Sequence, residues 1–408
     1  MIEKYATIKR GVIAFIGILF CLAAIYLLNI RIAYLEYSSV DLQQDYYAAR
    51  QLVNYESIYS DTDHLNYHPP STAVLIVPLS FLPYKDAAII WTLLSIILYF
   101  LTWWLIFKEL NIHLPFEYSL VFLGFILCWH PFLQNIGLGQ WSILIGFCIA
   151  ICWICLRHDR YLLAGIILGL ACLIKLYPGL LIVYLLFTKR WKAIVATIST
   201  VIVGIIILTF ILGPEEVIYY FTTVIPRDTS IYNTFPQNYS ILGILGKFFV
   251  NGEWVNPIFI SPIPINIVAL ILDIVVLIIL IRTMHLLQND KDNNDINFVL
   301  PIVAMFFISP ISWQHNLTIL TIPICLLLKK IMNKSFNNKF GYGLIILVVF
   351  LLSLPDVQID RLLISLVLPD RLPWYLGIGF LFYDVGLIIL WFLLLPSRKA
   401  VVANIANQ

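Results

Sequence analysis

Charged side chains are scarce in this sequence. Only 12% of the 408 residues are Asp, Glu, Lys or Arg, whereas soluble domains carry about 25%. A soluble chain of this length would divide into two or three domains, each with its own polar surface. The charges present cannot cover such surfaces, so the composition excludes a soluble globular protein.

Cysteine is sparse too, and its placement excludes two common uses. The seven cysteines form an odd number, and all of them lie in apolar stretches. This arrangement disfavours both a disulfide framework and a zinc site. We therefore expect small buried side chains at Cys21, Cys128, Cys148, Cys152, Cys155, Cys172 and Cys325.

Three further absences narrow the class of function. The net charge is only +2, so nothing favours a nucleic acid as partner. No cluster of acidic residues has the spacing of metal ligands, so we expect no metal and no other cofactor. Internal repeats are also missing, which disfavours transporters built from inverted repeats.

Long apolar runs are what the sequence has in abundance. Hydrophobic residues make up 61% of the chain, and the mean hydropathy is +0.93. A helix needs roughly 20 residues to cross the hydrocarbon of a bilayer. We predict an all-α polytopic membrane protein, one domain over residues 1–408, with about twelve crossings: Gly11–Leu28, Ala88–Phe107, Tyr118–His130, Trp141–Leu156, Leu162–Ile174, Gly179–Phe187, Ala193–Leu212, Ile267–Ile281, Phe298–Ile311, Leu317–Leu328, Gly341–Leu354 and Trp374–Leu395.

Two segments near the N-terminus are not read as ordinary crossings or loops. The basic head Met1–Arg10 precedes an apolar run that is too long for a cleaved signal peptide, so we predict an uncleaved first helix. Ser71–Pro83 is apolar but short and bounded by prolines. We therefore predict that it is a re-entrant or interfacial piece.

Lysine and arginine predict the orientation. With the N-terminus in the cytoplasm and alternating crossings, 17 of the 25 basic residues fall on the cytoplasmic side. This bias predicts cytoplasmic termini. We expect the membrane to be the plasma (inner) membrane. The extracytoplasmic loops are then 29–70, 213–266 and 312–316, with others at Pro131–Gln140, Lys175–Pro178 and Pro355–Pro373.

Two carboxylates open the first outer loop. Asp41 and Asp45 lie four residues apart, a spacing that puts them on one face of a helix. A carboxylate with a tuned environment can remove a proton from a hydroxyl. The alternative is an ordinary solvated loop in which Asp41 caps the following helix.

Other polar residues lie at the edges of apolar runs, and each has two interpretations. Lys175 either binds a lipid phosphate as a point charge or extends its charge to the interface from a helix end. His315 either contacts an anion or is structural at a helix end. Tyr67 and His68 precede two prolines, which stop one helix and aim the next.

Two further carboxylates, Asp273 and Asp384, fall within predicted helices. Charged groups inside a membrane are functional candidates. Either one can instead bond a neighbouring helix.

In order along the chain, these segments resemble glycosyltransferase family 87. The resemblance covers roughly residues 35 to 320 and rests on the first outer loop and five short motifs. The motifs are Tyr67-His68-Pro69-Pro70 running into Val77-Pro78-Leu79, Gly139-Gln140-Trp141, Lys175-Leu176-Tyr177-Pro178, Asn238-Tyr239-Ser240, and Ser309-Pro310-Ile311-Ser312-Trp313 with His315.

The resemblance implies a GT-C bundle and a hexosyltransferase activity. Such an enzyme takes a sugar, most often mannose, from a polyprenyl phosphate. It adds the sugar to a lipid-linked or envelope glycan on the extracytoplasmic face. The implied partners are membrane lipids, the polyprenyl-phosphate-linked sugar, and a glycolipid or glycan acceptor.

The resemblance also assigns roles to residues. Asp41 is the general base, with Asp45 as its rival, and His315 supports the base or contacts the donor phosphate. Lys175 holds that phosphate. Substrate-binding candidates are Tyr67, His68, Gln140, Asn238 and Trp313.

The chain departs from the family pattern at two motifs. It has Gln314-His315-Asn316 where members often have Asp-His-His, and Asn238-Tyr239-Ser240 where they often have Asn-Gln-Ser. These departures leave the donor sugar open. Two alternatives are a polymerase or ligase with a diphosphate-linked donor, and a lipid or glycan transporter or flippase.

Overall fold

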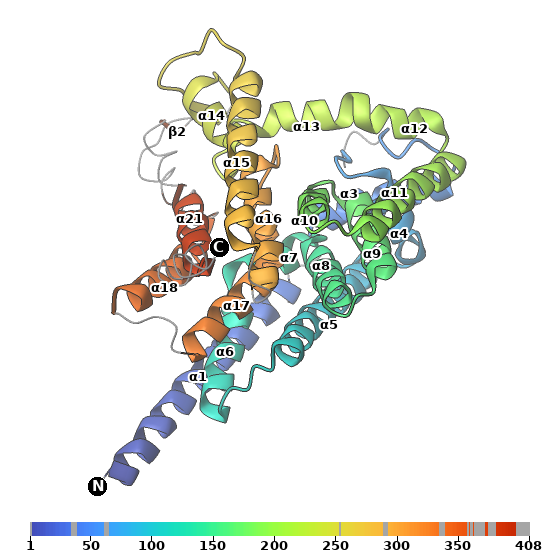
Figure 1. The fold of residues 1–408 in the computed structure, drawn as a ribbon. Helices are drawn as coiled ribbons and strands as arrows, with labels where there is room; N and C mark the ends of the chain where they lie inside the picture. Colours follow the sequence, from blue (N-terminus) through green and yellow to red (C-terminus); the bar gives the residue numbers. More distant parts are fainter. Residues whose placement is uncertain are drawn as a thin grey trace. The chain divides into compact units, whose positions relative to one another are not determined.

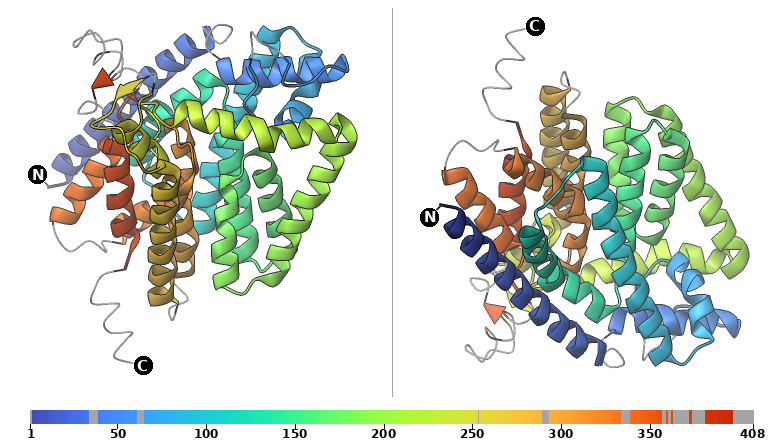
Figure 2. Two further views of the ribbon diagram at one scale, coloured as in Figure 1. Left: turned by 90° about the horizontal axis from the view of Figure 1, so that it is seen from above. Right: turned by 90° about the horizontal axis from the view of Figure 1, so that it is seen from below.

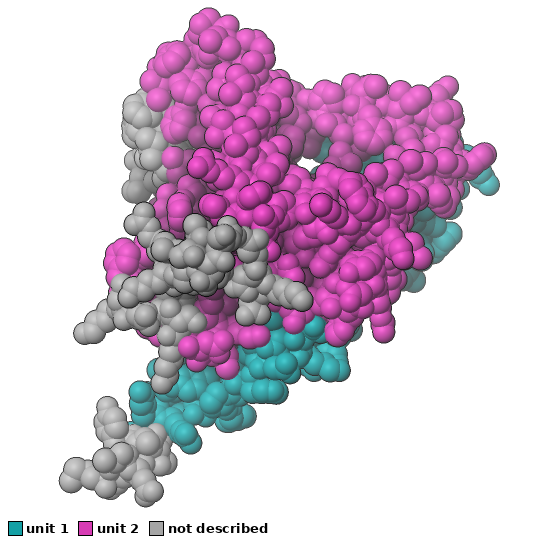
Figure 3. Space-filling view, in the orientation of Figure 1, with its two compact units in different colours: residues 1–147, 315–318 teal, residues 148–314, 319–408 magenta. Residues whose placement is uncertain are grey.

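A computed structural model describes most of the chain, and its residues divide into two compact units, coloured separately in Figure 3. Unit 1 comprises residues 1–147 and 315–318, and unit 2 comprises residues 148–314 and 319–408. The described residues are 2–33, 39–60, 65–252, 254–288, 293–333, 339–356, 359, 362, 372–373 and 381–396.

Unit 1 is mainly helical, with short turns and loops between its helices. Its helices are α1 (Ile2–Ala33), α3 (Val40–Val53), α4 (Pro70–Ser80), α5 (Tyr84–Leu110), α6 (Phe116–Cys128) and α7 (His130–Leu138), followed by the start of α8 (Ser142–Arg157).

Helices α1 and α6 run side by side (Figures 1 and 2). They approach closely because Gly124 has no side chain. A Cβ at that position would lie only 2.3 Å from the Cβ of Phe20.

A bend of 44° separates α6 from α7. Trp129 has extended backbone angles there, and Pro131 lies in the first turn of α7, where its missing N–H has no helical partner to lose. We predicted Pro131–Gln140 as an outer loop. That prediction is wrong for most of the segment, because the proline starts a helix that ends at Gly139.

Unit 2 holds the rest of the helices. They are the remainder of α8, α9 (Tyr161–Ile174), η1 (Tyr177–Leu180), α10 (Leu181–Phe187), α11 (Trp191–Leu212), α12 (Pro214–Tyr219), the π-helical turn η2 (Tyr220–Val224), α13 (Ile225–Tyr232), α14 (Ile241–Phe249), α15 (Ile265–Leu287), α16 (Asn294–Ile308), α17 (Thr321–Met332), α18 (Lys339–Leu351) and α21 (Phe382–Leu394).

Three smaller features complete the described chain. The 3₁₀ segment η4 (Gln314–Leu320) contains the part of unit 1 that follows residue 314. Strands β1 (Val255–Asn256) and β2 (Leu372–Pro373) pair in parallel. Helices α12 and α13 join through η2 into one long helix, which runs crosswise to α11 in Figure 2.

Unit 2 has two distinct ends. Helices α8, α10 and α15 end at one of them, and α9, α11 and α16 begin there. One pocket and one ion pair contain residues from these termini, which shows that they lie together. Asp295 of α16 pairs there with Arg157 of α8 and accepts a hydrogen bond from Trp153 Nε1 at 2.9 Å. Arg160, Lys189, Arg190 and Lys192 gather at this end as well, so we call it the basic end.

The count of about twelve crossings is not confirmed. Among the described residues, five helices are long and apolar enough to cross a membrane, or six if the bent pair α6 and α7 is one span. Seven more apolar helices have only 10–17 residues. The structure is consistent with an all-α membrane protein, in which breaks such as the one between α9 and η1 shorten the apolar runs.

Two predicted segments fall partly outside the described residues. The last predicted crossing, Trp374–Leu395, is described from residue 381 onward and contains α21. The predicted outer loop Pro355–Pro373 lies mostly outside the described residues.

Candidate active site

The site begins at the N-terminus of α3. Ser39 occupies the capping position, and the hydroxyl of Tyr84 donates to its carbonyl at 3.0 Å. Asp41 therefore lies within the first turn and not at the cap, which corrects the capping alternative. A negative charge is favoured at this position, because the helix dipole is positive at its N-terminus.

Asp41 is half-buried and oriented by a neighbouring amide. Gln140 Nε2 donates to its Oδ2 at 2.7 Å. Gln140 itself is only 4% exposed, so the packing around it fixes the direction of this hydrogen bond. The contact holds one carboxylate oxygen in place while part of the Asp41 side chain remains accessible.

Asp45 lies one helical turn later in a different environment. Its side chain is fully buried. Trp141 Nε1 donates to Oδ2 at 2.7 Å, and His68 Nδ1 lies 2.9 Å from the same atom. An ionised carboxylate only accepts, so the hydrogen bond from His68 requires a proton on Nδ1.

Two consecutive residues thus donate hydrogen bonds to two carboxylates that lie one helical turn apart. Gln140 reaches Asp41 and Trp141 reaches Asp45, which is possible because side chains four residues apart on a helix lie about 5–6 Å apart. We call the group Asp41, Asp45, His68, Gln140 and Trp141 the α3 site.

Gly139 permits the close approach of this segment to α3. It ends α7 with a φ of +74°, a left-handed conformation that suits glycine. A Cβ there would lie 2.5 Å from the Cβ of Leu42. The Gly139 carbonyl accepts from Trp91 Nε1 at 2.9 Å, and the rings of Trp91 and Trp141 pack edge to face.

The Tyr67–Pro70 motif also contacts the α3 site. Tyr67 N donates to Gln44 of α3 at 3.3 Å, and the His68 carbonyl accepts from Tyr59 at 3.0 Å. Pro69 and Pro70 then start α4. The prolines start the next helix, as predicted from the sequence, but they do not stop the preceding one, because α3 already ends at Val53. The His68 side chain contacts Asp45.

His315 belongs to unit 1, although it lies far from α3 in sequence. It is 2% exposed, and its carbonyl accepts from Thr318 at 2.8 Å. The next residue, Asn316, accepts from Ser142 Oγ at 2.9 Å. The stretch 140–142 therefore contacts Asp41, Asp45 and Asn316 in turn, which brings the His315 backbone beside the α3 site.

In unit 2, Asn238 joins two segments that are far apart in the sequence. Its Nδ2 donates to the carbonyls of Tyr232 and Pro310, both at 3.1 Å. Its Oδ1 accepts from Ser240 N at 3.1 Å and Ser312 N at 3.0 Å. The side chain is fully buried, so these four bonds satisfy the amide completely.

The neighbours of Asn238 extend this connection. Tyr239 N donates to the Ser312 carbonyl at 2.9 Å, and Ser240 Oγ donates to the Pro310 carbonyl at 2.8 Å. Ser240 also caps α14 by accepting from Gly243 N. We call the paired segments 238–240 and 309–312 the loop junction.

A buried lysine underlies the loop junction. Lys247 of α14 donates to the carbonyls of Pro236 at 3.0 Å and Asn238 at 2.9 Å. Burial lowers the pKa of Lys247 to about 8, and the carboxylate of Asp384 acts in the opposite direction. Asp384, one of the two intramembrane carboxylates singled out from the sequence, is thus the electrostatic partner of a lysine that sequence reasoning missed.

Trp313 and Lys175 are the remaining predicted site residues of unit 2. Trp313 packs edge to face against Tyr232 and Phe235, with ring centroids 5.2 Å apart in both pairs. Lys175 directly follows the end of α9 and is partly exposed. Its position between α9 and η1 fits either the phosphate-binding or the interfacial interpretation.

The structure thus groups the predicted residues within each unit. Unit 1 brings together Asp41, Asp45, His68 and Gln140, whereas Lys175, Asn238 and Trp313 belong to unit 2. No group of three or more His, Cys, Asp or Glu side chains that could hold a metal occurs among the described residues. The expectation of a metal-free site remains a prediction.

Comparison with known protein families gives a match. The sequence profile of glycosyltransferase family 87 matches residues 66–310, more than half of the chain. Asp41, Asp45 and His315 lie just outside the matched range. No curated protein matches the chain. The profile match and the helical membrane architecture agree with the resemblance seen in the sequence, and this chain belongs to glycosyltransferase family 87.

Proposed function

We propose that this membrane glycosyltransferase uses a polyprenyl-phosphate-linked sugar, most often mannose in the family, as its donor. The acceptor is a lipid-linked or envelope glycan at the extracytoplasmic face of the plasma membrane. Family membership supports sugar transfer in general. The lysine and arginine bias supports the face, because it assigns the loops with Asp41 and His315 to the extracytoplasmic side.

The observation that carries the proposal is the contrast between the two carboxylates of α3. Asp41 is half-buried and accepts from the Gln140 amide, whereas Asp45 is fully buried and accepts from Trp141 and His68. A general base must reach the proton that it removes. Asp41 meets this requirement, so we assign it as the base and Asp45 as the residue that holds His68 and Trp141 in place.

The proposed transfer needs one base and no acid. Asp41 takes the proton of the acceptor hydroxyl as that oxygen attacks C1 of the donor sugar. The bond between C1 and the phosphate oxygen breaks, and polyprenyl phosphate leaves with the electron pair. Attack opposite the phosphate inverts the configuration at C1, and the phosphate leaves as an anion that needs no protonation.

Basic side chains serve the donor phosphate in this proposal. Lys175 supplies a point charge to the phosphate, and His315 supplies a donor or supports the base. Gln140 orients Asp41 through its amide. Tyr67, His68, Asn238 and Trp313 act mainly by positioning loops, since His68 and Asn238 direct their polar side-chain atoms to other protein groups.

The test is an Asp41→Asn variant in a membrane assay with polyprenyl-phosphate mannose. Asparagine keeps the acceptor oxygen for Gln140 but cannot act as a base. We expect turnover to fall about 10²–10⁴-fold, with unchanged insertion and thermal stability. The measurement is release of free polyprenyl phosphate together with the glycosylated product.

The matched control is Asp86→Asn, because Asp86 is an exposed carboxylate in the first turn of α5 in the same unit. It should retain wild-type turnover. Full activity in Asp41→Asn with a verified donor would show that another group is the base. A wild-type protein that moves lipid without releasing polyprenyl phosphate would instead identify a transporter.

A further inference from the structure

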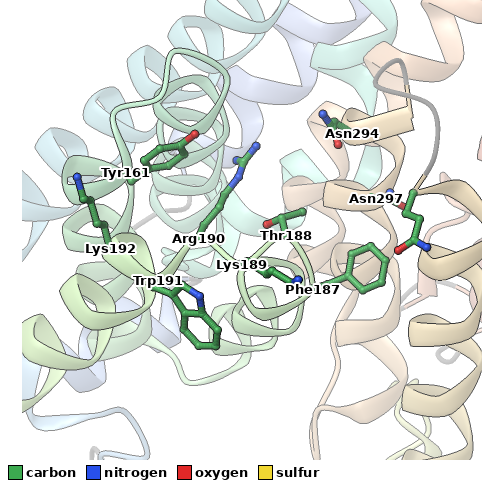
Figure 4. A pocket seen from close by; sticks show the side chains of 10 residues that line it. Tyr161, Phe187, Thr188, Lys189, Arg190, Trp191, Lys192, Asn294 and Asn297 are labelled. Atoms are coloured by element: carbon green, nitrogen blue, oxygen red, sulfur yellow. The ribbon is translucent and has the colours of Figure 1, made fainter.

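A pocket of about 660 Å³ lies at the basic end of unit 2 and plays no part in the proposed reaction. Its wall comes from the start of α9, the turn between α10 and α11, and the first turn of α16 (Figure 4). Helix α9 separates it from Lys175, and its 14 residues span about 21 Å at 1.5 Å per residue. The pocket therefore lies at the opposite end of unit 2 from the predicted donor-phosphate residue.

The pocket lining is cationic. Lys189, Arg190 and Lys192 all line it, and none of the lining residues is a carboxylate. The nearby Asp295 is already paired with Arg157 and bonded by Trp153, and Asp159 accepts from the Tyr161 hydroxyl. Among the described residues, the positive charge of the lining therefore has no acidic partner within the pocket, which favours an anionic ligand.

Arg190 is held in place by ring stacking. Its guanidinium carbon lies 5.5 Å from the ring centroid of Tyr161 and 5.2 Å from that of Tyr184. Its Nη1 is buried and has no hydrogen-bond partner among the described residues. A planar, pre-oriented guanidinium with unused donors suits the oxygens of a phosphate.

The opposite wall supplies amides. Asn294 and Asn297 of α16 face the α10–α11 turn across the pocket in Figure 4. Asn297 is 2% exposed, and its Oδ1 is buried with no hydrogen-bond partner in the part of the chain that the structure describes. A buried acceptor without a partner is costly. Beside a cationic wall, it fits a ligand that carries hydroxyl groups as well as a phosphate.

The surface beside the pocket suits a lipid ligand. Trp191 lines the pocket and is 60% exposed, and an exposed apolar face continues from it along α11 through Val195, Ile198 and Ile202. Tryptophan is enriched where the headgroups meet the hydrocarbon. A headgroup in the pocket can thus continue into acyl chains along α11, whereas a soluble phosphate would not use this face.

We propose that this pocket binds the headgroup of an anionic glycerophospholipid of the phosphatidylglycerol type. Arg190, Lys189 and Lys192 hold the phosphodiester, and Asn297 accepts from a headgroup hydroxyl. By the lysine and arginine bias, the lipid comes from the cytoplasmic leaflet. The proposal is independent of the sugar-transfer site, because it concerns only the opposite end of unit 2.

The test uses the full chain in nanodiscs of phosphatidylcholine with increasing phosphatidylglycerol. Bound lipid is counted by native mass spectrometry after release from the discs, and thermal stability is measured in parallel. The binding variant is Lys189→Asn with Lys192→Gln. Both lysines are exposed, and asparagine tolerates the φ of +55° at residue 189. We expect about a thirtyfold loss of phosphatidylglycerol retention, since two basic residues near a bilayer together contribute about 2 kcal/mol and about 1.4 kcal/mol corresponds to a factor of ten.

Arg282→Gln is the matched control, because it removes an exposed charge from α15 outside the pocket. It should retain the lipid as wild type does. Arg190→Lys keeps the positive charge but removes the planar guanidinium. It should retain less phosphatidylglycerol than wild type if the guanidinium geometry matters. Equal retention in the double lysine variant and wild type would overturn the proposal.

A second arm adds glycerol 1-phosphate or inorganic phosphate at millimolar concentration. Under our proposal, neither displaces phosphatidylglycerol and neither raises the melting temperature of delipidated protein. If either does so, and the double lysine variant abolishes the effect, the pocket binds a soluble phosphate and the lipid assignment is wrong. These readouts do not depend on glycosyltransferase activity.

Discussion

At the α3 site, side-chain donors from residues 140 and 141 end on carboxylates, and Asp41 keeps part of its surface accessible. At the loop junction, all four hydrogen bonds of the Asn238 amide end on backbone groups, and the side chain is fully buried. Both regions carry motifs of the same family. The difference indicates that one presents a reactive group, while the other holds two segments together. Substitutions in the two regions should therefore separate activity from stability.

Asn238→Ala should give the largest loss of stability. It removes four hydrogen bonds and leaves buried backbone groups without partners, each of which costs about 1–3 kcal/mol. We expect a loss of about 4 kcal/mol or failure to accumulate as folded protein. The measurement is thermal unfolding of the detergent-solubilised protein.

Asn256→Ala is the control for this change, since Asn256 is an exposed asparagine in the same unit. It should melt like wild type. An Asn238→Ala protein that is fully stable but inactive would break the comparison, because Asn238 would then act on substrate.

Asp45→Asn should reduce stability less, by about 2 kcal/mol. The two donors from His68 and Trp141 would lose a charged acceptor, and hydrogen bonds to charged groups contribute about 1.5–3 kcal/mol. Thermal unfolding of Asp45→Asn and Asp41→Asn side by side measures the difference. A stable, inactive Asp45→Asn together with an active Asp41→Asn would exchange the roles assigned to the two carboxylates.

Gly139→Ala tests the α3 site through the segment that donates hydrogen bonds to its two carboxylates. Alanine is strained at a φ of +74° and would contact Leu42, so we expect a loss of about 1–2 kcal/mol. Turnover should also fall, since Gln140 would be displaced from Asp41. Kinetic assay and thermal unfolding of the same preparation test both effects, and Gly343→Ala, which adds a Cβ into open space within α18, is the control.

A pH dependence of stability is also predicted beneath the loop junction. The pKa of Lys247 is about 8 in the folded protein, against about 10.4 for an ordinary lysine. Between these values the unfolded chain binds more protons, so this group adds stability as the pH rises, and it contributes no pH dependence below about 8. The melting temperature of wild type should therefore rise relative to Lys247→Met by roughly 2–5 °C from pH 7.5 to 10. A constant difference across this range would show that Lys247 does not titrate there.

Hydropathy predicted most of the helices but not their lengths. The run Leu162–Ile174 corresponds closely to α9, because one uninterrupted apolar stretch forms one helix. Helix α7 was missed, since Pro131 and the polar residues after it are also typical of loops. Apolar content alone does not reveal that a proline begins a helix.

At the site, local spacing predicted only local geometry. The four-residue separation placed Asp41 and Asp45 on one face of α3, as observed. Their partners Gln140 and Trp141 are 99 and 96 residues away, and no periodicity indicates such a contact. The motif resemblance named Gln140, but the opposite environments of the two carboxylates depend on tertiary packing.

The loop junction also constrains the order of events during synthesis of the chain. The hydrogen bond from Asn238 to the Pro310 carbonyl can form only after residue 310, which lies 72 positions later in the chain, has been synthesised. At a synthesis rate of roughly 5–20 residues per second, the ribosome needs several seconds to make that stretch. During this interval the bonds of Asn238 to Pro310 and Ser312 cannot form, whereas its bonds to Tyr232 and Ser240 are local. The loop junction can close only after residue 312 has been made, so a nascent chain arrested before residue 310 should expose an open junction to chaperones and proteases.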